Sequence, residues 1–196
     1  MPNVIGPIVR LQIQCAPLKV GEKPNRRYVP DPVAVVEAVL LTRLGITARV
    51  DGHETFDVHH GAHPSKKNED GMNGISLGFT SHYREMQQRF GPHIQPGCAA
   101  ENILIESTRR FGLDHLAGGL VLLDASGREK GRLTRLAVAT PCRPFAGFAH
   151  RYEQVEPAVL KESLAFLDGG TRGFYCSLTP ESGPVTLKCG DLVGTA

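Results

Sequence analysis

The stretch PGCAAENILI, residues 96–105, carries the most information about the fold. Its first half combines proline, glycine and small residues, which is typical of a tight turn whose backbone N–H groups can approach a ligand closely. Its second half is apolar and rich in isoleucine, which predicts a short buried strand. Glu101 and Asn102 therefore stand where a turn enters a strand. They could line a binding site or only cap free backbone groups, and the local sequence alone favours capping.

Strand patterns recur on both sides of this stretch. In residues 4–14, Val9, Leu11 and Ile13 alternate with Arg10 and Gln12, the pattern of a half-buried strand. Residues 33–50 predict two strands joined by a turn at 44–45, and further strands are expected at 75–79, 102–106, 119–124, 133–140, 173–179 and 184–194.

Helical signals are few. Residues 80–90 predict a helix capped by Thr80 or Ser81, and residues 157–167 predict a second helix that begins at Pro157. Many short strands with few helices indicate a mainly β (α+β) fold, a closed or partly closed barrel. A length of 196 residues suits one core, so we expect a single domain over residues 1–196.

The amino-acid composition of the chain limits the kinds of partner that we expect for the protein. The net charge is +2 with scattered basic residues, so we expect no nucleic-acid partner. The sequence has neither an apolar run of membrane-spanning length nor the basic start and apolar run of a secretory signal. Five cysteines without a CxxC pair favour reduced thiols, and we expect a cytoplasmic protein. Edge strands leave a monomer or a homodimer open.

The stretch DVHHGAH, residues 57–63, is a second candidate for chemistry. Histidines can ligate metal, hold an anion or move protons near neutral pH. Gly61 and Pro64 argue against a helix here, so the spacing does not bring the rings onto one face. Zinc ligation and unrelated loop histidines both remain open. The polar residues 66–73 that follow could form a lid or a surface loop.

The third candidate is TPCRP, residues 140–144. Cys142 follows a predicted strand and stands beside Arg143, whose charge would favour the thiolate. A cysteine is also often a small buried apolar residue, which is the better interpretation for Cys176 and Cys189 in their predicted strands.

Taken in order, these stretches resemble the MOSC domain, named after the C-terminal part of molybdenum cofactor sulfurases. That family carries a His-Gly-Gly loop, a Pro-Gly-x-x-Gly-Glu-Asn turn, a cysteine after a Thr-Pro pair, an Arg-Gly strand and a final Gly-Asp. The matching residues are 60–62, 96–102, 140–142, 171–175 and 190–191, and the resemblance spans nearly the whole chain.

The resemblance implies a MOSC-type β-barrel with a few flanking helices and a pocket for a molybdenum-pterin cofactor or a sulfur species. Cys142 would be the molybdenum ligand or a persulfide-bearing thiol. His60 and Glu101 would join it as catalytic residues. The cofactor-binding residues would be Gly61, Gly97, Asn102, Arg143 and Arg172.

Two alanines depart from the family pattern. Ala62 and Ala100 stand where the family has glycine, so each adds a methyl group that could fill cofactor space or resist a positive φ.

Three functions follow from the resemblance and these departures. The first is a stand-alone cofactor-binding protein that reduces an N-oxygenated small molecule or carries sulfur. The second is a cofactor-independent enzyme using Cys142, His60 and Glu101. The third is a non-catalytic sulfur or cofactor carrier. Reduction would need a separate electron-donor protein, because no iron–sulfur cysteine cluster is present, and persulfide would need a separate sulfur donor.

Overall fold

The computed structural model describes residues 2–65 and 70–196. Part of the suggested lid, residues 66–69, lies outside these ranges. Strands dominate the described chain, and three α-helices and one short 3₁₀ helix accompany them. The elements are β1 (Asn3–Gln14), β2 (Lys19–Val20), β3 (Arg27–Tyr28), β4 (Val33–Val36), β5 (Ala38–Thr42), β6 (Gly45–Val50), β7 (His53–Phe56), β8 (Ile75–Phe79), α1 (Thr80–Phe90), β9 (Ile103–Ile105), η1 (Leu113–Leu116), β10 (Leu120–Leu123), β11 (Glu129–Val138), α2 (Arg143–Ala149), α3 (Pro157–Leu167), β12 (Phe174–Leu178), β13 (Val185–Lys188) and β14 (Leu192–Thr195).

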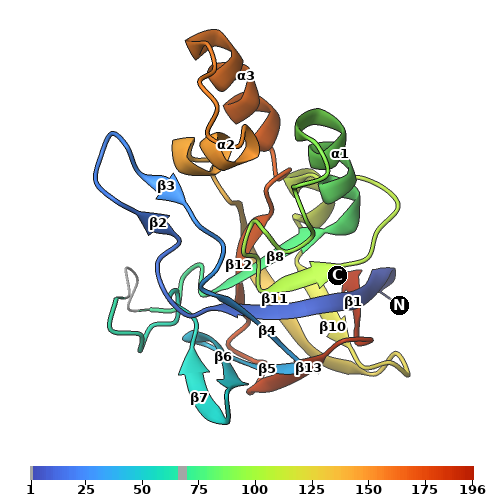
Figure 1. Ribbon diagram of the computed structural model, residues 1–196. Coiled ribbons are helices and arrows are strands. Elements are labelled where there is room, and N and C mark those ends of the chain that lie inside the picture. Colours follow the sequence, from blue (N-terminus) through green and yellow to red (C-terminus); the bar gives the residue numbers. More distant parts are fainter. Residues whose placement is uncertain (1, 66–69) are drawn as a thin grey trace.

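Seven strands close into a barrel in the order β14-β10-β11-β12-β8-β9-β1, because β1 also pairs with β14. Only the β8–β9 pair in this ring is parallel. The predicted mainly β fold with a closed barrel and flanking helices is confirmed. Figure 1 shows the helices on one side of the barrel and the small sheet β13-β5-β6-β7 on the opposite side.

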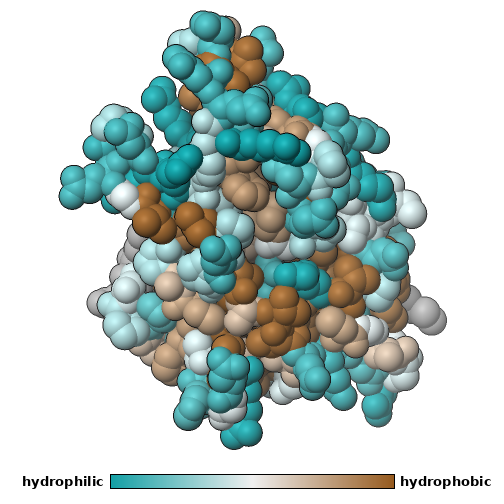
Figure 2. All heavy atoms as spheres, in the orientation of Figure 1, coloured by the Kyte–Doolittle hydropathy of each residue, from teal (hydrophilic) through white to brown (hydrophobic). Residues whose placement is uncertain are grey.

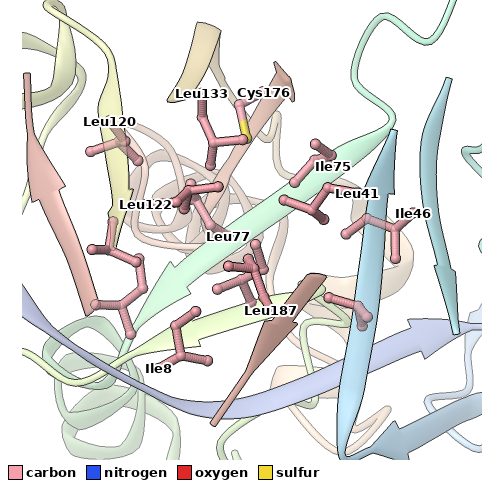
Figure 3. Close-up of a cluster of buried hydrophobic side chains, with 14 of the residues drawn as sticks. Ile8, Leu41, Ile46, Ile75, Leu77, Leu120, Leu122, Leu133, Cys176 and Leu187 are labelled. Atoms are coloured by element: carbon pink, nitrogen blue, oxygen red, sulfur yellow. The ribbon is translucent and has the colours of Figure 1, made fainter. Parts of the chain in front are cut away.

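The core fills the barrel and its junction with the small sheet. Leu77 of β8, Leu122 of β10 and Leu187 of β13 are fully buried in one apolar cluster, and Figure 3 shows these side chains directed into a common interior. Cys176 belongs to the same cluster, as predicted. A second apolar cluster lies under the helices around Tyr28 and Phe145, whose rings meet edge to face at 5.1 Å.

The two longer predicted helices form at the expected residues. Gly91 ends α1, and Pro157 occupies the first turn of α3. The predicted cap of α1 is wrong, because Phe79 is the N-cap residue. The hydroxyl of Thr80 instead donates to the carbonyl of Ser107 and accepts from its amide, which ties the helix to the chain after β9.

Four details differ from the sequence predictions. Val9 is 43% exposed, because the β1–β9 register shifts between Ile8 and Arg10 and turns Ile8 inward. The expected strand 184–194 is two strands that belong to different sheets. Cys189 lies between them and is exposed. Helix α2 was not predicted.

The outer surface is mixed in character. Figure 2 shows hydrophilic side chains spread over the visible face with apolar ones between them, including a group over β1 and β4, where Val9 and Val35 are exposed. None of the helices in the described ranges is long and apolar enough to cross a membrane.

Candidate functional site

A pocket of about 350 Å³ lies between the barrel and the helical side of the molecule. Its walls come from segments far apart in the sequence: the β2–β3 hairpin, the end of β1, the loop after Val58, the turn before β9, and the start of β12. In Figure 1 the hairpin projects beside α2, above the barrel. Its lining includes Leu77 of the first apolar cluster and Tyr28 of the second, so the packing of both clusters fixes its walls.

The turn at residues 97–102 is held from below by β1. The side-chain amide of Gln12 donates to the carbonyls of Gly97 and Glu101 at 2.8 and 2.7 Å. Gly97 has φ +91° and is packed so closely that a Cβ would lie 2.4 Å from Nε of Arg10. Ala100 takes φ +64°, a left-handed conformation that is unfavourable for alanine. The sequence departure at Ala100 thus leaves the turn in place at a cost in strain.

Glu101 extends from this turn into the pocket and is 3% exposed. The hydroxyl of Tyr83 donates to its Oε2 at 2.7 Å and accepts from the amide of Ala99 at 3.0 Å. Among the described residues, Oε1 has no hydrogen-bond partner. Burial raises the pKa of Glu101 to about 7, although Tyr83, Arg10 and Arg172 oppose the rise. The carboxyl can therefore hold or release a proton near neutral pH, and Oε1 is the oxygen free to carry it.

Asn102, the next residue, turns away from the pocket and joins a buried network. Its Oδ1 accepts from the amide and the hydroxyl of Ser76, and its Nδ2 donates to Oδ2 of Asp57 at 2.8 Å. Asp57 in turn accepts from the amide and from Nδ1 of His59, both at 2.9 Å. His59 lines the pocket. The network thus links the turn at residues 97–102 to an imidazole in the pocket wall.

Arg172 supplies a positive charge to the same cavity. Its guanidinium lies 5.0 Å from the ring centre of Phe145, a cation–π arrangement. Its Nε is fully buried and has no hydrogen-bond partner among the described residues. Lys19 and Arg26 of the hairpin also line the pocket and are exposed. Glu101 is the one acidic residue in the described lining, so the three cations leave the pocket with a net positive charge whether or not Glu101 is protonated.

Two solved structures share this fold. The YuaD protein from Bacillus subtilis is 16% identical in sequence, with a TM-score of 0.53 over 95% of this chain and 96% of its own. A second structure, described as a hypothetical protein, is 10% identical, with a TM-score of 0.54 over 98% of this chain and 69% of its own. No family model matches the chain. No curated protein matches it either.

Four of the eight residues proposed from the sequence belong to this site. Glu101 and Arg172 line the pocket. Asn102 and Gly97 support it from the turn beneath, through the contacts with Asp57 and Gln12.

Cys142 stands at the N-cap of α2, half-buried against the second apolar cluster. It is absent from the described pocket lining, but Thr140, two residues earlier, lines the pocket. Cys142 is also one of the groups that raise the pKa of Arg172, although burial opposes that rise. Cys142 therefore acts electrostatically on the cation of the pocket from outside the described lining.

His60, Gly61 and Arg143 lie elsewhere, contrary to the expectation that they line one site with Glu101. The His60 ring stacks on Phe56 at 4.6 Å and faces a second, more open pocket of about 580 Å³. The Gly61 amide donates to the carbonyl of Leu44 at 2.7 Å. Arg143 is the exposed first residue of α2. Residues 59 and 60 face opposite ways because the chain turns sharply there, with the His60 amide bonded to the carbonyl of Asp57.

The zinc interpretation finds no ligand set in residues 2–65 and 70–196, where no group of three or more His, Cys, Asp or Glu could hold a metal ion. The histidine rings have local partners instead. His60 Nδ1 accepts from the amide of Ala62, and His63 Nδ1 accepts from the amide of Ser65, both at 3.0 Å.

Sequence reasoning did not assign His59, Tyr83, Lys19 or Arg26 to this pocket, although His59 belongs to the candidate stretch of residues 57–63. The Asp-x-His spacing of Asp57 and His59 was a usable signal, since an aspartate often bonds the backbone two residues later in a turn. The other three are brought to the pocket by packing between distant segments, which no local pattern records.

Proposed function

We propose that this protein binds the phosphorylated pterin of molybdenum cofactor in the pocket beside Glu101, as MOSC domains do, and uses it to reduce an N-oxygenated small molecule. The observation that carries the proposal is Arg172, whose buried Nε lacks a hydrogen-bond partner within the described ranges, in a cavity that Lys19 and Arg26 also line. A cavity with three cations and one readily protonated carboxyl favours an anionic ligand, and guanidinium groups bind phosphate through paired hydrogen bonds.

The charged lining fits the phosphate of such a group, whereas Cys142, the proposed metal ligand, lies outside the described lining. Arg172 would hold the phosphate, with Lys19 and Arg26 at the pocket mouth. Cys142 would supply a thiolate, a soft ligand suited to the metal. Of the two alanine departures, only Ala100 lines this pocket, and Ala62 lines the other one. When bound, the cofactor would supply oxygen-atom transfer chemistry.

The protein's own part in the reaction is the transfer of protons. Reduction of an N-hydroxylated amine, R₂N–OH + 2e⁻ + 2H⁺ → R₂NH + H₂O, consumes two electrons and two protons. The electrons would come from a separate electron-donor protein. Glu101 is suited to deliver a proton, because its pKa of about 7 matches the working pH and Tyr83 fixes its other oxygen.

The test is analysis of molybdenum and pterin in protein purified from a molybdate-supplied host. Arg172→Gln and Cys142→Ser are compared with Arg143→Gln, which removes an exposed arginine next to the same cysteine. We expect the cofactor in the parent and in Arg143→Gln, no metal in Cys142→Ser, and little pterin in Arg172→Gln. Circular dichroism verifies that each variant is folded. A parent protein without molybdenum and pterin would overturn the proposal and leave the cofactor-independent enzyme or the carrier.

A further inference from the structure

We propose that His59, oriented by Asp57, is the second proton-transfer residue of this pocket, and that Asn102 and Asp57 are its positioning residues. This inference rests on the proposed function, because it assigns a role in the chemistry of the same bound ligand. It replaces His60 as the histidine of the site.

Asp57 is placed as a fixed acceptor. It is fully buried, and both of its oxygens are occupied: Oδ2 accepts from the amide of Gln14 at 2.7 Å and from Asn102, and Oδ1 accepts twice from His59. Burial opposes its charge, but the hydrogen bonds outweigh it and the pKa of Asp57 is lowered. The residue is therefore a carboxylate at neutral pH, with no freedom to rotate away from the histidine.

This acceptor determines which nitrogen of His59 can react. A carboxylate oxygen 2.9 Å from Nδ1 can only accept, so Nδ1 must carry a hydrogen. In the neutral ring the other nitrogen, Nε2, then carries the lone pair and is the atom that can accept a hydrogen bond or a proton. The His59 side chain is 35% exposed and lines the pocket, with its ring centre 5.8 Å from that of Tyr175. An imidazole held by a buried carboxylate, whose far nitrogen has no hydrogen-bond partner in the described part of the chain, is the arrangement of a proton-transfer pair.

The proposed reaction can use such a second group. It consumes two protons, and Glu101 holds one. The remaining described lining residues that ionise are arginine, lysine and tyrosine, whose ordinary pKa values lie at about 10 or above. Histidine is the side chain whose proton exchanges in the neutral range. His59 and Glu101 together therefore match the two-proton balance.

His60 provides a matched comparison. It neighbours His59 in the chain and is buried, but its ring stacks on Phe56, and its Nε2 lies 3.5 Å from the hydroxyl of Thr42, which also faces the second pocket. A proton-transfer role at the first pocket predicts a strong effect for His59 and none for His60.

The experiment is nitrogen-15 NMR of histidine-labelled protein at pH 7, with His59→Gln and His60→Gln used to assign the two rings. We expect His59 as the Nδ1–H tautomer, whereas Nε2–H predominates in free histidine. Added inorganic phosphate should shift the His59 Nε2 resonance and leave His60 unchanged. In Asp57→Asn one carboxylate oxygen is replaced by an NH₂ group, which donates hydrogen bonds. Both oxygens of Asp57 now accept, so this NH₂ group would face an existing donor, and the preference of His59 for the Nδ1–H tautomer should be lost. If that variant does not fold, the tautomer of His59 in the parent protein still tests the inference.

Activity gives the second readout. In cofactor-loaded enzyme, His59→Gln should lower kcat about 100-fold with little change in KM, while His60→Gln should match the parent. An Nε2–H tautomer at His59 overturns the inference. Phosphate that binds through Arg172 without moving the His59 resonance also overturns it and leaves the proposed function standing. A parent that binds neither phosphate nor the cofactor rejects the proposed function itself.

Discussion

Glu101→Gln should make the protein more stable at alkaline pH while impairing proton transfer. The carboxyl is buried, and its pKa is about 7 in the folded protein against 4.5 as the ordinary value. That difference corresponds to about 3 kcal/mol. Glutamine keeps the shape of the protonated carboxyl and can still accept from Tyr83, but it cannot ionise.

The direction of this pH effect on the free energy of unfolding follows from the protons that the unfolded and folded chains bind. Between pH 4.5 and about 7 the unfolded chain releases the Glu101 proton while the folded chain keeps it. Folding then requires proton uptake, so the free energy of unfolding falls by about 1.4 kcal/mol for each pH unit. Above about pH 7 both states are ionised, and the loss stays constant. The glutamine variant lacks this fall, so its advantage should grow by about 2–3 kcal/mol between pH 5 and pH 8.

Urea unfolding at pH 5, 6, 7 and 8 measures the effect. The chain has no tryptophan, so far-UV circular dichroism is the suitable signal. Glu106→Gln is the matched control, because it removes an exposed carboxylate five residues away on the other side of β9. Titrations elsewhere are common to all three proteins and cancel in the differences. A Glu101→Gln advantage that stays constant from pH 5 to pH 8 would refute the assignment of a proton to this carboxyl.

Three further predictions concern the supports of the site. Ala100→Gly should stabilise the protein by roughly 0.5–1 kcal/mol in urea unfolding, because it relieves a left-handed alanine at φ +64°; Ala99→Gly, whose φ is not positive, should destabilise instead. Asn102→Asp should cost about 3–5 kcal/mol at pH 7, since it sets a carboxylate against Asp57, and the loss measured by urea unfolding should shrink at acid pH. Phe145→Ala should lower the free energy of unfolding by about 3–5 kcal/mol, because it empties a fully buried position in the second apolar cluster; thermal melts that show no loss would contradict this packing.

The local features of this protein were readable from its sequence. The helices at residues 80–90 and 157–167 follow from amphipathic periodicity and from Gly91 and Pro157 at their ends. The buried strand at residues 103–105 and the turn before it follow from a change in composition over a few residues. Glu101 was found for the same reason, since it is part of that turn.

Helix α2 was not predicted, because it begins at Arg143 and Pro144 and its seven residues are too few to show a helical periodicity in the sequence. The division of residues 184–194 between two sheets was hidden for a different reason. Both halves satisfy a strand pattern, and only pairing with β5 or β10 separates them.

The sequence by itself determined the class of fold and the turn that carries Glu101, because turns and periodic burial depend on neighbouring residues. Tertiary structure decided which side chains share the pocket: Arg172 rather than Arg143, and His59 rather than His60. These choices depend on barrel closure and on one sharp turn after Asp57, neither of which can be seen in the local sequence pattern. The direction of a side chain depends on the assembled sheet, so it cannot be predicted from a short stretch of the sequence.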